Sequence, residues 1–158
     1  MNVAVLADTH IPKRAKDLPQ AAYEVLARAE AIIHAGDVLV QEFLTRLQQF
    51  APVYAVQGNN DRELCLPTRL EITLEGVQIG VVHDSGKAKG RGRRLRRQFP
   101  EAQVVIFGHS HIAVNQYEDG LLLFNPGSAT DRRRQPKHTM GMLVVRAGQI
   151  VSKIIELD

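Results

Sequence analysis

Short apolar runs alternate with amphipathic segments along the first 60 residues of the chain. An uninterrupted apolar run such as Val3–Ala7 is typical of a strand that is buried on both faces. Asp17 and Pro19 predict the start of a helix, with Asp17 as its capping residue and Pro19 in its first turn. The first half is therefore expected to contain a strand over Val3–Ala7, a helix that starts near Pro19, a strand over Ala31–His34, a helix over Val40–Phe50 and a strand over Val53–Val56.

The second half contains apolar runs that are separated by turn residues. The dipeptide Glu75-Gly76 lies between two such runs and predicts a hairpin. The expected elements are strands over Leu70–Leu74, Val77–Val82, Val104–Phe107, Ala113–Tyr117, Leu121–Phe124, Met140–Val145 and Ile150–Leu157, and a helix over Arg91–Phe99. Strands that alternate with helices indicate a parallel sheet with right-handed crossovers. We therefore predict an α/β fold, a four-layer αββα sandwich in which two mixed β-sheets are flanked by helices.

The composition agrees with one globular domain over residues 1–158. Hydrophobic residues make up 44% of the chain and charged residues 23%, which excludes wholesale disorder. No apolar run approaches the roughly 20 residues that span a bilayer, so we expect no membrane association. The N-terminus has no signal-peptide pattern, which favours a cytoplasmic location. The single cysteine, Cys65, excludes an internal disulfide and a zinc site built from several cysteines.

Polar side chains that can bind a metal follow five of the predicted strands. They are Asp8, His10, Asp37, Asn59, His83, His109 and His111. Ligands bind beyond the carboxyl ends of the strands in open α/β sheets, so these side chains are expected to converge. Asp8 and His10 are two residues apart, as are His109 and His111, and in an extended segment such pairs point the same way. Glycines stand beside three of these positions, where a backbone without Cβ atoms can turn sharply.

The donor set points to a pair of divalent cations. Carboxylate, imidazole and amide oxygen without thiolate suits manganese, iron or zinc. Seven donors exceed what one tetrahedral ion requires, whereas two ions that share one carboxylate would use them all. Paired ions about 3.5–4 Å apart are the usual site for phosphoryl hydrolysis.

These residues form ordered blocks that resemble the calcineurin-like metallophosphoesterases, in particular their small bacterial and archaeal phosphodiesterase branch. The blocks are Asp8-Thr9-His10, Gly36-Asp37, Gly58-Asn59-Asn60-Asp61, His83, Gly108-His109-Ser110-His111 and Asn125-Pro126-Gly127-Ser128. The resemblance implies one ion held by Asp8, His10, Asp37 and His111. It implies a second ion held by Asp37, Asn59, His83 and His109. Asp37 would then bridge two divalent ions, and a hydroxide between them would attack phosphorus. Manganese is favoured, with iron, zinc, nickel and magnesium as alternatives.

Asn60 departs from the wider family, many members of which have a histidine here that is thought to protonate the leaving group. Asn60 can donate a hydrogen bond on the leaving-group side but cannot deliver a proton at neutral pH. We therefore expect a small phosphodiester or nucleotide-like substrate, with a preference for leaving groups that need little protonation, such as aryl groups. Asp61 is expected to support the ligands, and His34 to be a buried, hydrogen-bonded histidine.

The net charge of +3 is unevenly distributed. Residues 85–100 carry seven basic side chains and no acid, and a second basic segment covers residues 131–137. Arg91 and Arg132 are the candidate substrate-binding residues of these segments. Nucleic acid is an alternative substrate, and homo-oligomers are frequent in the branch that the chain resembles. Three other functions stay open on this fold: a phosphomonoesterase, a non-catalytic interaction scaffold such as a retromer subunit of eukaryotes, and a nucleic-acid binder. Seven intact donor positions argue against the scaffold.

Overall fold

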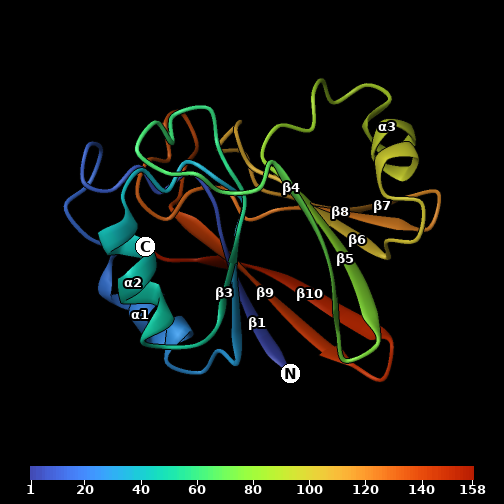
Figure 1. Ribbon diagram of the computed structural model, residues 1–158, viewed down its shortest axis with the longest axis horizontal. Coiled ribbons are helices and arrows are strands. Elements are labelled where there is room, and N and C mark those ends of the chain that lie inside the picture. The colour runs from blue at the N-terminus through green and yellow to red at the C-terminus, as the bar shows by residue number, and fades with distance from the viewer.

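Two mixed five-stranded sheets form the centre of the protein, as the computed structural model of residues 1–158 shows (Figure 1). In spatial order the first sheet contains β10 (Gln149–Glu156), β9 (Thr139–Arg146), β1 (Asn2–Leu6), β2 (Ala31–His34) and β3 (Val53–Ala55). The second contains β4 (Arg69–Leu74), β5 (Val77–Val82), β6 (Val104–Ile106), β8 (Leu121–Asn125) and β7 (Val114–Glu118). The helices are α1 (Gln20–Leu26), α2 (Gln41–Gln48) and α3 (Arg91–Gln98).

The four predicted layers are confirmed by where the apolar side chains pack. Val3 and Val5 of β1 lie in the core between the two sheets. Ala4 and Leu6, which alternate with them, pack against residues of α1 and α2 on the outer face of the first sheet. A third cluster, which includes Leu95 of α3, covers the outer face of the second sheet. The strand β1 is therefore buried on both faces, as its uninterrupted apolar run predicts.

The strand directions bring many carboxyl ends to one edge of the molecule. β1, β2 and β3 are parallel to one another, and so are β5, β6 and β8. The loops that follow these strands lie together at the top of Figure 1. The hairpin predicted at Glu75-Gly76 joins the antiparallel pair β4 and β5, with both turn residues at positive φ. The longest helices have eight residues each, and none is long and apolar enough to cross a membrane.

The predicted start of the first helix is wrong in one respect, because Asp17 does not cap it. The residue at the cap position is Pro19, with no side-chain hydrogen bond to the helix. The Asp17 carboxylate instead forms an ion pair with Arg46 of α2 at 2.7 Å, which ties the two helices together. α1 ends at Leu26, where the chain turns towards β2.

Candidate metal centre

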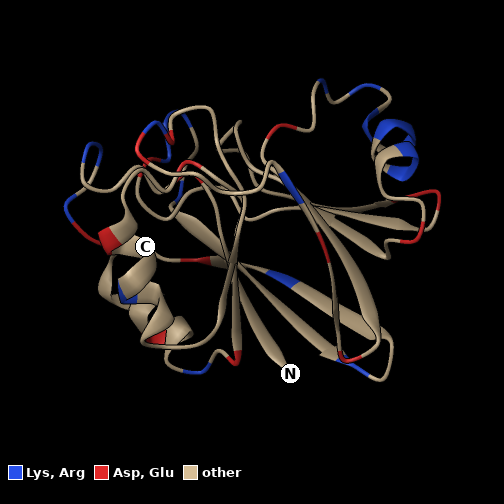
Figure 2. Ribbon diagram, in the orientation of Figure 1, with Lys and Arg blue, Asp and Glu red and all other residues tan.

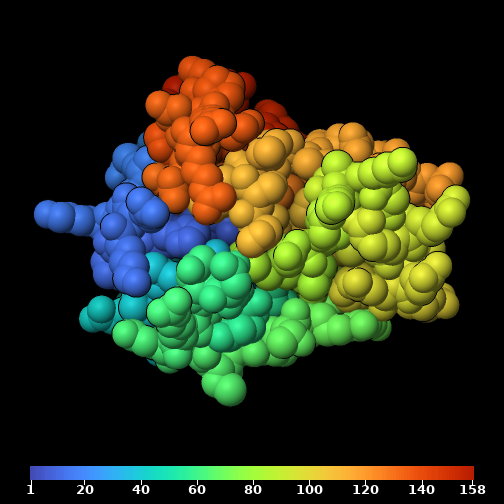
Figure 3. Space-filling view, turned by 90° about the horizontal axis from the view of Figure 1, so that it is seen from above, coloured from blue at the N-terminus to red at the C-terminus, as the bar shows by residue number.

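The seven predicted metal ligands all lie on loops at the carboxyl ends of β1, β2, β3, β5 and β6. Figure 3 looks down on this edge, and the dark blue N-terminal segment lies at the bottom of a hollow between loops from distant parts of the chain. Asp8, His10, Asp37, His83 and His111 are buried, whereas Asn59 and the side chain of His109 are more exposed.

The backbone at these positions differs from the prediction. Asp8 and His10 have φ angles of 53° and 46°, and His109 and His111 have φ angles of 71° and 63°. The extended geometry that was expected to orient each pair is therefore wrong, and the side chains converge through left-handed turns. Such turns cost of order 1 kcal/mol or more for residues other than glycine. Hydrogen bonds from Asp8 N to Gly36 O, at 3.0 Å, and from His10 N to Asp37 O, at 3.1 Å, help to hold them.

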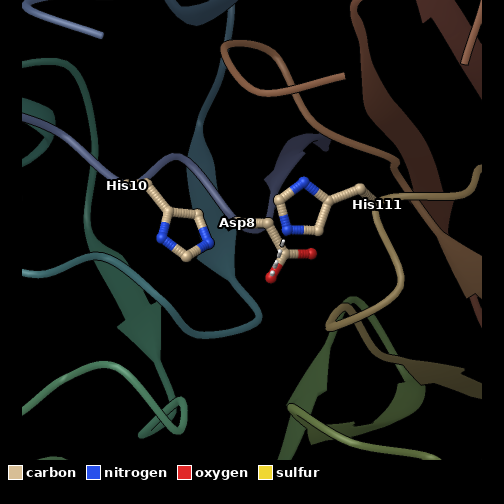
Figure 4. A group of neighbouring side chains, drawn as sticks. All are labelled: Asp8, His10 and His111. Carbon is tan, nitrogen blue, oxygen red and sulfur yellow. Dashed lines mark ion pairs between the residues drawn. The ribbon is translucent and has the colours of Figure 1, made fainter. Parts of the chain in front are cut away.

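Asp8, His10 and His111 form one buried triad whose donor atoms lie within 4.8 Å of one another (Figure 4). Both carboxylate oxygens of Asp8 and the Nε2 atoms of His10 and His111 have no hydrogen-bond partner in the protein. The Nδ1 atom of His111 donates to the backbone oxygen of Asp131 at 2.5 Å, so its Nε2 atom presents a lone pair in the neutral ring. Buried polar atoms are almost always paired, and a cation would satisfy all four.

Asp8, Asp37 and His83 form the second buried triad. His83 Nδ1 donates to the backbone oxygen of Ala35 at 2.7 Å, which leaves Nε2 as an acceptor in the neutral ring. This atom lies 2.9 Å from Asn59 Oδ1. His109 Nδ1 lies 3.2 Å from the same Asn59 oxygen. These three side chains could bind one cation together, and ligating histidines usually donate their other nitrogen to a carbonyl, as His83 does.

Asp37 lies between the two groups of donors. Its Oδ2 atom is 3.3 Å from His10 Nε2 and 3.5 Å from His83 Nε2. Asn60 donates to both carboxylate oxygens, from its backbone N at 2.8 Å and from Nδ2 at 2.9 Å. Burial by itself would raise the pKa of Asp37, but the close contacts with His10 and His83 and the hydrogen bonds from Asn60 outweigh it and lower the pKa well below its usual range.

The electrostatics of the other buried ligands show how much the site lacks positive charge. Burial raises the pKa of Asp8 to about 7, although nearby His83 acts against this shift. For His83, burial lowers the pKa, but the contact with Asp37 and the charge of Asp8 raise it overall. For His111, burial lowers the pKa more than its bond to Asp131 raises it. Bound cations would supply the positive charge that balances these buried carboxylates.

Two glycines are required by the close approach of the ligand loops. A Cβ atom on Gly58 would lie 2.2 Å from the backbone nitrogen of Asp37 and 2.3 Å from its Oδ1 atom. A Cβ atom on Gly36, which has a φ of +96°, would lie 2.5 Å from Nδ1 of His83. Any side chain at either position would therefore displace a ligand.

Several residues support the ligands from behind. The Asp61 carboxylate accepts backbone N–H bonds from Asp37, Gly58 and Leu39 at 2.7–3.0 Å, which agrees with its expected supporting role. Sequence reasoning missed the contributions of Asp131, whose carbonyl orients His111, and of the Ser128 hydroxyl, which donates to Asp8 O at 2.8 Å. The Asn125-Pro126-Gly127-Ser128 segment was a signal for Ser128, but an orienting backbone carbonyl has no signature in the sequence.

The two arginines expected to bind substrate have other contacts. The Arg91 guanidinium lies over the Phe107 ring, 4.7 Å from its centroid. Arg132 donates to the carbonyl of Gln135 at 2.6 Å and so closes its own loop. Arg133 of the same loop is close enough to His111 for its charge to contribute, after burial, to the lowered pKa of that histidine.

Comparison with known proteins gives a consistent picture. The profile of the calcineurin-like phosphoesterase superfamily domain matches residues 1–148. The chain is 38% identical to a "probable metallophosphoesterase" of Methanothermobacter thermautotrophicus, over 82% of this chain and 78% of that protein. It is 35% identical to another of Methanocaldococcus jannaschii, over 100% of this chain and 82% of that protein.

Solved structures share the fold at lower sequence identity. Vps29 of Entamoeba histolytica, in complex with zinc, has a TM-score of 0.81 and 22% identity, and the match covers 100% of both chains. An archaeal phosphodiesterase has a TM-score of 0.73 and 21% identity, with 98% of this chain and 100% of that chain covered. These likenesses show that the αββα architecture is shared.

Proposed function

Because the chain belongs to the calcineurin-like phosphoesterase superfamily, we propose that it is a metal-dependent phosphodiesterase that acts through a dinuclear centre. The observation that supports this most directly is the set of buried donor atoms without partners on Asp8, His10 and His111. Such atoms are costly in a folded protein unless an ion binds them.

The proposed centre uses all seven predicted ligands. Asp8, His10, Asp37 and His111 would hold one ion, and Asp37, Asn59, His83 and His109 would hold the other. The distances from Asp37 Oδ2 to His10 and His83 support a bridging role for this carboxylate. Asp8 belongs to both buried triads, so it would lie near both ions as well. When bound, two divalent ions lower the pKa of water and neutralise charge on phosphate oxygens.

The residues of the chain prepare the site for this chemistry. The carbonyls of Ala35 and Asp131 fix the ring tautomers of His83 and His111, so that both Nε2 lone pairs face the centre. Asn60 orients Asp37 with one Nδ2 hydrogen. Its second Nδ2 hydrogen would hydrogen-bond to the leaving oxygen without protonating it.

Manganese is the proposed ion, because a carboxylate, imidazole and amide set suits it. Zinc is the main alternative, since it is the ion bound in Vps29 of Entamoeba histolytica. The likeness to an archaeal phosphodiesterase favours a diester substrate over a monoester.

Hydrolysis of bis-p-nitrophenyl phosphate tests the proposal. Purified protein supplied with Mn²⁺ should release p-nitrophenol, and Asp37→Ala should lower kcat by about a hundredfold or more because a shared ligand is lost. Asp119→Ala, in the exposed turn between β7 and β8, is the matched control and should be as active as wild type. An inactive wild-type protein would contradict the enzyme, and faster turnover of p-nitrophenyl phosphate would favour a phosphomonoesterase.

A further inference from the structure

A pocket of about 220 Å³ adjoins the metal centre beside Asn60. Its lining residues are Pro12, Lys13, Leu39, Val40, Asn60, Arg62 and Glu63. Sites for whole small-molecule ligands usually have about 300–1,000 Å³, so this pocket has the size of a subsite for one group of a larger ligand. Asn60 joins it to the centre, because its Nδ2 atom donates to Asp37 Oδ2 at 2.9 Å.

The walls of the pocket are held by the same contacts that hold the ligands. Asp61 accepts hydrogen bonds from Leu39 N at 2.7 Å and from Gly58 N at 2.7 Å, which positions the floor and one wall. Arg14 N donates to His10 O at 2.8 Å and so closes the turn that carries Lys13. The two segments lie side by side in Figure 3, as blue and green-blue surfaces. The pocket is therefore built from the same hydrogen-bonded segments that carry the metal ligands.

The charges of the lining favour an anionic group. Lys13 and Arg62 are exposed, and neither forms an ion pair within the protein. Glu63 is the only acid of the lining, so cations exceed acids by one. Arginine and lysine are the side chains that bind phosphate oxygens most strongly. Leu39 and Val40 offer only a small apolar floor.

A second, independent observation concerns the leaving group. Asn60 stands at the junction of the pocket and the centre, and its amide cannot supply a proton at neutral pH. An alkoxide leaving group needs such a proton, whereas a phosphate is a weak enough base to leave without one. The positively charged pocket and the absence of a general acid at position 60 are therefore both suited to a leaving group that is itself a phosphate.

We propose that this pocket binds the departing phosphate of a diphosphate-bridged substrate, a phosphoanhydride with an organic group on each side. This inference rests on the proposed function and narrows its substrate class. The oxygen of water forms a bond to one phosphorus, and the bond from that phosphorus to the bridging oxygen breaks. The bridging oxygen keeps the electron pair and stays on the second phosphate. The products are two phosphate monoesters, and two protons are released to the solvent at neutral pH.

Two adenosine dimers test the proposal with the Mn²⁺-loaded full-length protein. One is diadenosine 5′,5′-diphosphate, and the other is the simple diester adenylyl-(3′→5′)-adenosine. The value of kcat/KM should be at least about tenfold higher for the anhydride. A second measure is kcat/KM for the anhydride divided by kcat/KM for bis-p-nitrophenyl phosphate. Lys13→Ala and Arg62→Ala should each lower this ratio by about tenfold, since each removes one charged hydrogen bond. Lys16→Ala, an exposed lysine outside the pocket, is the matched control and should leave that ratio unchanged.

Binding separates failure of this inference from failure of the proposed function. Calorimetry with adenosine 5′-(α,β-methylene)diphosphate and with AMP requires no turnover. Wild type should bind the methylene diphosphate about tenfold more tightly than AMP, whereas Arg62→Ala should bind the two ligands with similar affinity. Equal affinities, or a preference that survives both substitutions, would overturn the subsite even in an active enzyme. A protein that hydrolyses none of the three substrates would instead overturn the phosphodiesterase.

Discussion

Thr9 and His34 lie behind the ligands and connect two of the loops that carry them. The backbone N–H of Gly36 donates to His34 Nδ1 at 3.2 Å, so the ring proton is on Nε2 and is donated to Thr9 Oγ1 at 2.9 Å. Burial lowers the pKa of His34 to about 3, which keeps the ring neutral and this pattern intact at physiological pH. The expectation of a buried, hydrogen-bonded histidine is confirmed, and the structure adds that its partners flank Asp8, His10 and Asp37.

The hydroxyl of Thr9 should therefore matter for metal affinity. Thr9→Val removes it at nearly constant volume, and we expect the Kd for Mn²⁺ to rise by about tenfold, as is typical when a residue that orients ligands is lost. Thr9→Ser keeps the hydroxyl and should restore near wild-type affinity. Isothermal titration with Mn²⁺ measures both. If Thr9→Val lowers the Tm of the metal-free protein but leaves the Kd unchanged, the pair has only a structural role.

At the scale of elements, the basic segment around α3 is partly internal structure. Arg94 donates to the carbonyls of Ser85 at 3.0 Å and Lys89 at 2.7 Å, and also to that of Lys87. Arg96 donates to the carbonyl of Ala102 at 2.7 Å, beyond the end of the helix. Figure 2 shows the basic residues of α3 and of the loop before it, and these contacts explain why some of them are not free to bind an anion.

Loss of Arg94 should loosen the loop over residues 85–90. Arg94→Ala leaves three carbonyls without their donor, and we expect a loss of about 1–3 kcal/mol in the free energy of unfolding. Trypsin should then cleave faster after Lys87 and Lys89. Arg93→Ala provides the control, because Arg93 is exposed on the same helix. Similar cleavage rates for the two variants would show that Arg94 does not hold the loop.

At the scale of the whole molecule, the centre joins the two sheets. Asp8, His10, Asp37 and Asn59 follow strands of the first sheet, whereas His83, His109 and His111 follow strands of the second. Ions held by both sets would link the two halves of the sandwich. Metal binding should therefore stabilise the complete fold and not only the loops.

This stabilisation should depend on pH. The pKa of Asp8 is about 7 in the folded metal-free protein, compared with 3.8 for an unperturbed aspartate. Between about pH 4 and pH 7 the folded chain therefore keeps a proton on Asp8 that the unfolded chain has released. Rising pH therefore removes stability from the metal-free protein up to about pH 7, whereas a cation replaces that proton. At a hundredfold excess over Kd, Mn²⁺ should contribute about 2.7 kcal/mol, or roughly 5–10 °C in Tm.

Thermal melts at pH 5, 6, 7 and 8, with Mn²⁺ or with EDTA, measure this effect. The difference in Tm between the two conditions should grow up to about pH 7 and then level off. Asp8→Asn cannot ionise and should reduce the pH-dependent part of the difference, leaving the share that comes from His83, whose pKa is also raised. A difference that is the same at every pH would contradict the role assigned to Asp8.

The sequence by itself determined the order of the elements and the seven candidate ligands. Both are local features: an apolar run marks each buried strand, and a polar donor, often beside a glycine, marks its end. Tertiary structure alone decided how Asp8 and His10 converge through left-handed turns. It also decided which carbonyls orient His83 and His111, and that Lys13 and Arg62 share a pocket. These features depend on backbone conformation and on contacts between residues far apart in the chain, neither of which leaves a residue-type pattern in the sequence.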